Sequence, residues 1–514
     1  MAPDHRPTRS RFRVQPGDPD NGGDARPEQQ RRVIGPGSAL GICIGSMIGS
    51  GIFAVTGQIG PQLVSPLNIM LAWILAGVIA LAGALTLAEV AAMRPRASAQ
   101  YVVVHEMLGP RLGYVNGMIT LLIGYLASMA AVAMIAGAYV ARLVPDVDER
   151  MIATVLLLGL GGVHAATVVG GTRLNDVLVV LKSAVVVLLA VAGFTVTTEP
   201  FVPSTSVLEA ARLLEPGSVL ATVPVDATAA AIDAHLRTAA SPPLLSATLG
   251  AAIVAVTFAY LGWSNAADVA GEVRRPGRNV PIAIVGSVLL VGSLYLIVNL
   301  VYLRVVPPAA MVEVGPDGRL QPMTSIGAVV AERLLGPVGG RLVTGAIVLL
   351  LASTLSVAVM TCGRVIAAMA WKGELPAAAG GLNRRGAPTV AIAAQIAASI
   401  GIVWITGLRS LLEYVGVLVT LAVVLTMLSA MLLRHRRPDD PRPFRMPLYP
   451  LPPLVSIGLG GWLVASAAAE DWIPVAAAAG TLAAMVAARP LLTRPLEIDD
   501  IDDIGDHDGA SRAS

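Results

Sequence analysis

Residues 45–53 of the chain read GSMIGSGIF, in the middle of an apolar run that extends from residue 37 to residue 60. An apolar run of about 20 residues is what an α-helix needs to cross a bilayer. The glycines and serines weaken that helix, because each glycine costs roughly 1 kcal/mol relative to alanine. The sequence therefore predicts a membrane-spanning helix that is unwound near its middle.

This predicted break has two interpretations. Unwound backbone is tolerated inside a membrane only where it lines a cavity or is buried in protein. Its free N–H groups, with the start of the next half-helix, suit a carboxylate. Gly45 and Gly49 also form a GxxxG pattern, which indicates close packing between helices. This stretch alone leaves both a binding site and a packing contact open.

A second break favours the binding site. Residues 257–265 read TFAYLGWSN, inside another apolar run at residues 244–270. The two runs are the first and the sixth along the chain, so they hold corresponding positions in two halves of five helices. A matched pair of interrupted helices indicates a transporter site built from inverted repeats. The repeat is inferred from position alone.

The composition agrees with a membrane protein. Of the 514 residues 55% are hydrophobic and only 14% are charged, which is too little charge to cover a soluble globule. The apolar residues form long runs and not the short alternating segments of a barrel. We therefore predict an all-α polytopic membrane protein with about twelve transmembrane helices, at residues 37–60, 66–93, 112–143, 151–170, 174–198, 244–270, 281–304, 338–370, 389–407, 411–433, 449–469 and 472–492.

Arginine clusters predict the orientation, because Lys and Arg stay on the cytoplasmic side of short loops. The clusters stand in alternate connections, at Arg31-Arg32, Arg94/Arg96, Arg274-Arg275/Arg278, Arg384-Arg385 and Arg434/Arg436-Arg437. Both termini are then cytoplasmic, in the cell (inner) membrane, and the loops at 199–243 and 305–337 face outward. The transporter domain covers residues 35–493. The polar tails at 1–34 and 494–514 are predicted to be disordered.

A lysine inside a predicted span is a third feature. The chain has only two lysines, and one of them, Lys182, lies about eight residues into the fifth apolar run, or about 12 Å deep. A charged side chain at such a depth is expensive, and its default interpretation is functional. Desolvation disfavours the charged amine, so that the group could exchange a proton. The alternative is that the side chain snorkels to the cytoplasmic surface.

Other polar groups carry weaker signals. Glu89 could gate the inner vestibule or pair with a loop arginine, and Asp268 and Glu272 are expected in an ion-pair cluster with nearby arginines. No metal-ligand spacing, phosphate-binding loop, nucleophile–base pair or cofactor motif is visible, so neither an enzyme nor ATP-driven transport is expected. The net charge of only +2 suggests no nucleic-acid partner.

These motifs resemble the amino acid–polyamine–organocation (APC) superfamily of permeases, particularly its bacterial cationic and L-type amino acid transporters. The resemblance extends over about residues 35–490. It is carried by residues 48–53 in the first run and residues 258–263 in the sixth. Further family signatures match residues 89–95, 268–281 and 442–450.

The resemblance implies a leucine-transporter (LeuT) type fold, with two inverted five-helix repeats followed by helices 11 and 12. It also implies a substrate site at both breaks. The substrate carboxylate would bind backbone amides of Ser50 and Gly51, with Gly49 also in the site and Ile48 offering its carbonyl, and the substrate amino group would bind carbonyls of Phe258, Ala259 and Leu261. Trp263 would lie near the side-chain pocket, and Tyr260 would act with Glu89 in gating.

The resemblance further implies that Lys182 takes the place of a sodium ion, so that transport is sodium-independent. Proton coupling and amino acid exchange both remain open. The sequence departs from the family pattern at Ser98 to Tyr101 and at Gly271. The third and eighth spans carry no acid at residues 121–140 and 348–360 that could pair with a cationic side chain. Neutral amino acids are therefore the predicted substrates.

Two rivals remain beside a proton-coupled transporter of neutral amino acids. One is an obligatory exchanger, or antiporter, and the other is a membrane sensor that binds without transport. L-type members can pair with a single-span glycoprotein through a disulfide at an external loop. Cys43 and Cys362 both lie inside apolar runs, so we expect no disulfide-linked partner. The expected partners are the amino acid, protons and the lipid bilayer.

Overall fold

The computed structural model describes residues 34–492, except for positions 96–98, 145–146, 167–171, 215–218, 224–227, 239–241, 245, 269, 316–317, 372–374 and 384–385. The two predicted tails lie outside the described residues, apart from Ile34. This residue forms an isolated parallel bridge with Val273.

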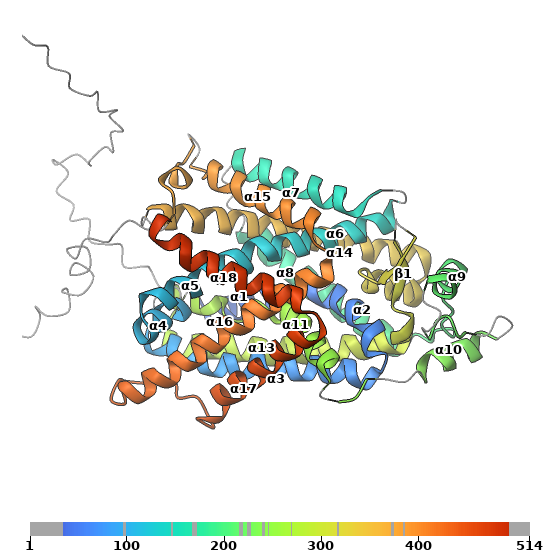
Figure 1. The fold of residues 1–514 in the computed structure, drawn as a ribbon, viewed down its shortest axis with the longest axis horizontal. Coiled ribbons are helices and arrows are strands. Elements are labelled where there is room, and N and C mark those ends of the chain that lie inside the picture. Colours follow the sequence, from blue (N-terminus) through green and yellow to red (C-terminus); the bar gives the residue numbers. More distant parts are fainter. Residues whose placement is uncertain are drawn as a thin grey trace, which may run out of the picture.

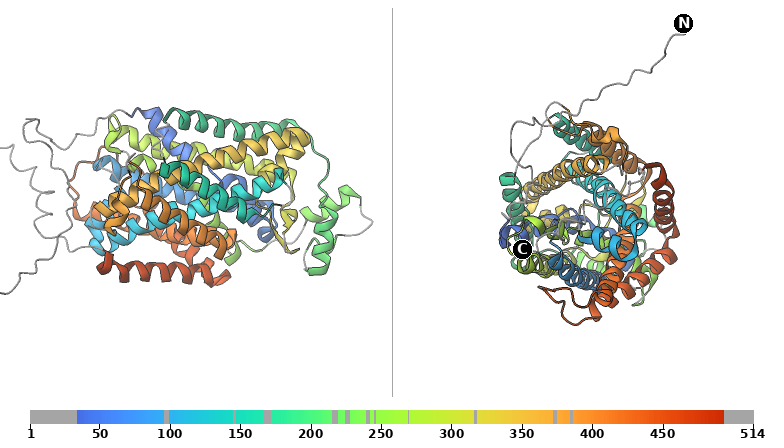
Figure 2. Two further views of the ribbon diagram at one scale, coloured as in Figure 1. Left: turned by 90° about the horizontal axis from the view of Figure 1, so that it is seen from above. Right: turned by 90° about the vertical axis from the view of Figure 1, so that its left-hand side faces the viewer.

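Long helices run side by side along the longest axis of the molecule and form one bundle (Figures 1 and 2). The elements of the first half are α1 (Pro36–Met47), α2 (Gly51–Leu63), α3 (Pro66–Met93), α4 (Ala99–Leu108), α5 (Pro110–Leu121), the π-helical turn η1 (Leu122–Ala127), α6 (Ser128–Leu143), α7 (Glu149–Ala166) and α8 (Thr172–Thr195). Short helices α9 (Thr205–Leu214) and α10 (Ala229–Arg237) follow.

The second half begins with another interrupted helix. Its elements are α11 (Ala247–Thr257), η2 (Phe258–Tyr260), α12 (Asn265–Asp268), η3 (Ala270–Glu272), α13 (Pro276–Val305), η4 (Pro308–Ala310), β1 (Val312–Val314), β2 (Leu320–Pro322), α14 (Ile326–Trp371), η5 (Ala377–Gly380), α15 (Thr389–Ile405), α16 (Leu408–Arg436), α17 (Leu451–Glu470) and α18 (Trp472–Leu492). Viewed end-on, α18 lies at the edge of the bundle (Figure 2).

Eight helical segments of the described chain are long and apolar enough to cross a membrane, at Pro36–Leu63, Pro66–Met93, Pro110–Leu143, Glu149–Ala166, Pro276–Val305, Ile326–Ala367, Leu408–Arg436 and Leu451–Glu470. Four shorter apolar helices, at Val180–Thr195, Ala247–Tyr260, Thr389–Ile405 and Trp472–Ala487, fall in the remaining predicted spans. The chain is thus an all-α polytopic membrane protein. The exact number of twelve crossings and the inverted repeat stay predictions.

The helix α14 differs from its expected boundary. A span was predicted to begin at residue 338, but the helix begins at Ile326 and bends at Gly336, where φ is +73°. The bend precedes Pro337, and proline disfavours helical backbone in the residue before it. The predicted outer loop therefore ends in a helical segment.

The two ends of the bundle differ in composition. One end carries α9, α10 and the antiparallel pair β1–β2, and we call it the hairpin end (Figure 1). The opposite end carries α4 and the connection 437–450, and we call it the arginine-rich end. These are the loops that the charge pattern predicts outside and inside, respectively. The described loops are thus sorted to opposite ends of the bundle, as the alternating pattern requires.

Hydrogen bonds close the hairpin end around α2. The Gln58 amide donates to the Thr324 hydroxyl at 2.9 Å and to the Pro322 carbonyl at 3.2 Å. On another side of α2, the Tyr139 hydroxyl donates to the Phe53 carbonyl at 2.7 Å. These contacts join α2 to α6 and to the segment after β2. In this conformation the hairpin end is therefore closed over the second half of the first span.

Glu89 holds the arginine-rich end together. Its side chain is 5% exposed and pairs with Arg434 at 3.3 Å and with Arg442 at 3.2 Å. It also accepts the backbone N–H of Met446 at 2.7 Å. One carboxylate on α3 therefore joins the end of α16 to the connection 437–450. This is the arginine pairing that was one of the two interpretations of Glu89, and its role in gating stays a prediction.

Replacing Glu89→Ala is expected to lower the free energy of unfolding by about 3–5 kcal/mol, because it leaves the buried guanidinium group of Arg442 and the part-buried one of Arg434 without their shared carboxylate. The matched control is Glu106→Ala, which breaks a partly exposed pair with Arg94 and should cost about 1 kcal/mol or less. The measurement is the thermal unfolding of the purified proteins in detergent. Equal losses in the two variants would contradict this account of the cluster.

Candidate functional site

The two breaks that the sequence predicts lie against each other. The first separates α1 from α2 at residues 48–50, and the second follows α11 at residues 258–264. Gly51 stands directly beside Ala259, since a Cβ on Gly51 would lie 2.5 Å from the Ala259 Cα. Only a residue without a side chain allows this approach. The structure therefore confirms both breaks and brings them into contact.

Helix ends of opposite polarity meet at this contact. Gly51 is the first residue of α2, so the amide groups around it have no partner within their own helix. Thr257 is the last residue of α11, and the Phe258 N–H caps this end by bonding the Ala255 and Val256 carbonyls. The N-terminus of a helix carries partial positive charge and the C-terminus partial negative charge. The contact thus offers an anion-binding and a cation-binding end side by side.

The predicted ligand atoms already have some partners. The Phe258 carbonyl accepts the backbone N–H of Leu261 at 3.2 Å. The Ala259 carbonyl accepts the Tyr295 hydroxyl at 3.1 Å, and the Trp263 carbonyl accepts the Cys43 thiol at 3.2 Å. A carbonyl oxygen has a second lone pair, so these bonds leave room for a ligand. The structure brings together Ile48, Gly49, Ser50 and Gly51 with Phe258 and Ala259, while their roles in binding stay predictions.

Helix α13 supplies partners that the sequence analysis missed. The Tyr295 hydroxyl also donates to the Met47 carbonyl, which ends α1. One turn further along, the Asn299 side chain bonds the Thr56 hydroxyl of α2. Both residues are 0% exposed. The available signal was a pair of polar residues at i and i+4 in an apolar span, because buried polar groups in membranes need partners.

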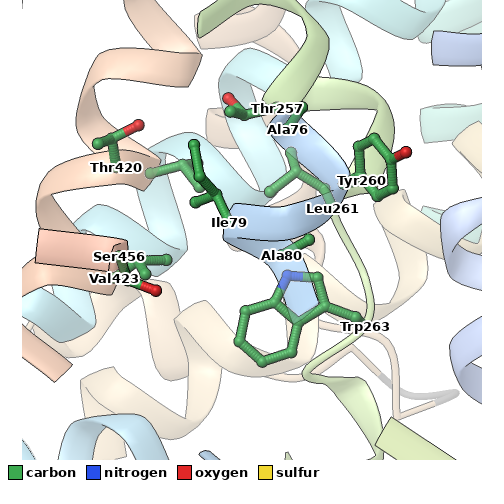
Figure 3. A pocket seen from close by; sticks show the side chains of 11 residues that line it. Ala76, Ile79, Ala80, Thr257, Tyr260, Leu261, Trp263, Thr420, Val423 and Ser456 are labelled. Carbon is green, nitrogen blue, oxygen red and sulfur yellow. The ribbon is translucent and has the colours of Figure 1, made fainter. Parts of the chain in front are cut away.

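A small apolar cavity lies beside the second break (Figure 3). It is lined by α3, the second break, α16 and α17, through Ala76, Ile79, Ala80, Thr257, Tyr260, Leu261, Trp263, Val419, Thr420, Val423 and Ser456. No residue of α1 or α2 belongs to this lining. The cavity therefore lies between the second break, α3, α16 and α17. Its lining holds three hydroxyl-bearing residues besides Tyr260 and no charged side chain.

Trp263 and Tyr260 take different places at this cavity. The Trp263 ring lies against Gly83 of α3, where a Cβ would come within 3.2 Å of the ring. The Tyr260 hydroxyl donates to the Trp73 carbonyl at 3.1 Å, and the side chain is 3% exposed. Trp263 thus lines the cavity, and its part in binding a substrate side chain stays a prediction. Tyr260 is anchored to α3, and its gating role stays a prediction.

Lys182 lies on α8 and is 5% exposed. Its ammonium group donates to the Thr354 hydroxyl of α14 at 2.7 Å. Among the ion pairs formed within the described chain, none involves this lysine. The side chain is therefore held inside the bundle by a neutral group, and it does not snorkel to the surface.

Over the described positions, no group of three or more His, Cys, Asp or Glu residues could hold a metal ion. Cys43 and Cys362 are both free and buried. His164 of α7 bonds the Ser356 hydroxyl at 2.8 Å, as expected of a buried histidine with a satisfied ring nitrogen.

Comparisons with known proteins point to one family. The sequence profile described as "Amino acid permease" matches residues 34–486. The serine/threonine exchanger SteT of Bacillus subtilis is 26% identical, over 86% of this chain and 92% of that protein. The large neutral amino acids transporter small subunit 2 of Rattus norvegicus is 25% identical, over 86% and 79%. The methylthioribose transporter of Bacillus subtilis is 24% identical, over 84% and 87%.

The contact between the two breaks can be tested with Gly51→Ala. The added methyl group would overlap Ala259, and overpacking of this kind lowers the free energy of unfolding by about 1–3 kcal/mol. The control is Gly41→Ala in α1, where nothing lies within 4 Å of the new Cβ and alanine favours the helix. Thermal unfolding in detergent compares the two. A Gly51→Ala protein as stable as the Gly41→Ala protein would contradict the contact.

Proposed function

Because the chain belongs to the amino acid permease family of the APC superfamily, we propose that it is a secondary transporter of neutral amino acids that works without sodium and is coupled to protons. Membership in the family establishes a membrane protein of amino acid transport. The substrate class, the coupling and the binding residues are the proposal.

The contact between the helix ends carries this proposal. An amino acid is a zwitterion, with a carboxylate and an ammonium group on one carbon atom. The N-terminus of α2 at Ser50 and Gly51 suits the carboxylate. The carbonyls at the end of α11, at Phe258 and Ala259, suit the ammonium group. Since Gly51 touches Ala259, the two receptors lie side by side, as a zwitterion on one carbon atom requires.

The cavity beside Trp263 supports a neutral substrate side chain. Its lining contains no charged residue, so a cationic or anionic side chain would lack a counter-charge there. Thr257, Thr420 and Ser456 add hydroxyl groups to an otherwise apolar wall. The Ser456 oxygen is buried and has no hydrogen-bond partner in the described structure. Small apolar or hydroxyl-bearing side chains fit this lining best.

Lys182 supports proton coupling in place of sodium. A buried ammonium group with a single neutral partner is penalised by desolvation, so it can release its proton during transport. A fixed positive charge inside the bundle also disfavours a sodium ion nearby. The zwitterionic substrate carries no net charge, so the proton would then be the net charge that moves.

Obligatory exchange is the alternative, and one relative favours it. SteT of Bacillus subtilis is called a serine/threonine exchanger, and the match covers 92% of the length of SteT. An exchanger uses the same site for both substrates, so the geometry of the breaks fits it equally well. A sensor that binds amino acids without transporting them would also use this site.

Uptake into liposomes separates these functions. The protein is reconstituted without sodium and with an alkaline lumen, and uptake of labelled alanine, serine, leucine and arginine is followed with and without a protonophore. Proton-coupled transport predicts accumulation of the neutral amino acids that the protonophore abolishes. Uptake only into preloaded vesicles would establish exchange instead, and binding without flux a sensor. Preference for arginine would overturn the neutral substrate class.

Lys182→Met tests the coupling residue. The variant keeps the length of the side chain but has no proton to exchange, so we expect proton-driven accumulation to fall at least tenfold and the pH dependence of uptake to flatten. Lys182→Arg is the matched control, because it keeps a positive charge that does not titrate. It should also lose the pH dependence. Normal accumulation and pH dependence in a folded Lys182→Met protein would refute the assignment.

A further inference from the structure

One hydroxyl group lies between the two breaks. Tyr295 of α13 is 0% exposed, and its hydroxyl is within hydrogen-bond distance of the Met47 carbonyl and 3.1 Å from the Ala259 carbonyl. Met47 is the last residue of α1, and Ala259 belongs to the turn after α11. The two carbonyls therefore belong to different interrupted helices, and the same side chain reaches both.

A phenolic hydroxyl has a single proton, so it donates to only one carbonyl at a time. The Ala259 carbonyl is one of the acceptors that the proposed function assigns to the ammonium group of the substrate. An ammonium group forms a charge-assisted hydrogen bond, which is about twice as strong as a neutral one. The Tyr295 hydroxyl already lies nearer the Met47 carbonyl, and the arrival of the ammonium group at Ala259 would commit its proton to Met47.

We propose that Tyr295 is a positioning residue that couples occupation of the amino-group site at Ala259 to the end of α1 at Met47. The inference rests on the proposed function, because it takes Ala259 as a ligand of the amino group. Binding of the amine strengthens the hydrogen bond that holds the end of α1. The first span thereby responds to a ligand group that is bound by the sixth.

The surroundings of Tyr295 fix its hydroxyl in this position. The Tyr295 ring packs edge-on against Trp73, with centroids 5.3 Å apart, and against Tyr260, with centroids 5.5 Å apart. One turn along α13, the Asn299 side chain donates to the Tyr295 carbonyl at 2.8 Å and bonds Thr56 of α2. Helix α13 thus contacts α1 through Tyr295 and α2 through Asn299. As one continuous helix, α13 therefore extends past the first break and contacts the chain on both sides of it.

A purely structural role makes a different prediction. If the hydroxyl only satisfied a buried carbonyl, its removal would weaken every ligand of the site to the same degree. Coupling to the amino group predicts a selective loss, which affects ligands with an amine and spares those without one. A ligand and its deaminated analogue therefore distinguish the two roles.

The test compares Tyr295→Phe with Tyr302→Phe. Tyr302 is on the same helix and is also 0% exposed, but its hydroxyl has no hydrogen-bond partner in the described part of the chain. Both variants keep the ring and lose only the oxygen. The substrate is whichever of alanine, serine and leucine the wild-type protein takes up best in liposomes. The competitor is the corresponding carboxylic acid without the amine, namely propanoate, 3-hydroxypropanoate or 4-methylpentanoate.

We expect Tyr295→Phe to raise the KM for the amino acid about tenfold, which is the size of one buried hydrogen bond. The inhibition constant of the deaminated acid should stay within about twofold of the wild-type value. Tyr302→Phe should change neither quantity by more than about twofold. A Tyr295→Phe protein that does not survive purification is measured in membrane vesicles, where the same comparison applies.

Two results would overturn the inference while the proposed function stands. One is a KM for Tyr295→Phe within twofold of that for Tyr302→Phe, and the other is an equal loss for the amino acid and its deaminated analogue. Wild-type protein that takes up none of the three amino acids would overturn the proposed function itself, and the inference with it. The wild-type assay thus separates the two failures.

Discussion

A backbone N–H or C=O group in the hydrocarbon of a membrane has no water to bond, and each unpaired group costs several kcal/mol. Two broken helices in this bundle therefore need partners from their neighbours. The Tyr295 hydroxyl donates to the Met47 and Ala259 carbonyls, the Tyr139 hydroxyl to the Phe53 carbonyl, and the Cys43 thiol to the Trp263 carbonyl. The breaks persist because α13, α6 and α1 place hydrogen-bond donors opposite these carbonyl groups.

The same constraint explains what the sequence could predict. A cluster of small residues in an apolar run is a local property, so both breaks and the bounds of α3 could be read without knowledge of the fold. The burial of Lys182 followed from its depth in an apolar run. The neutral partner of that lysine, Thr354, belongs to a helix more than a hundred residues away and left no local sign.

Other features depend on tertiary contacts and were not predictable. The helical segment before Gly336 lies in the predicted outer loop 305–337. Pro337 follows the glycine, and this pair indicates a helix start as readily as a bend within a helix. The π-helical turn at Leu122–Ala127 contains no proline and reads as ordinary helix. Tyr295 and Asn299 could have been noticed as polar residues in an apolar span, yet only the fold shows that they face the first span on both sides of its break.

Closure of the hairpin end has a consequence for thermodynamics. Gln58 of α2 donates two hydrogen bonds, to Thr324 and Pro322, and the Phe53 carbonyl accepts a third from Tyr139; all three must break before this end can open. At about 1 kcal/mol each, three such bonds favour the closed state roughly a hundredfold. A solute that arrives at that end meets the open state in only about one molecule in a hundred. Its apparent affinity there is weaker than its intrinsic affinity by the same factor. Hydrogen bonds away from the binding site can thus set the apparent affinity that a solute meets at one end of the bundle.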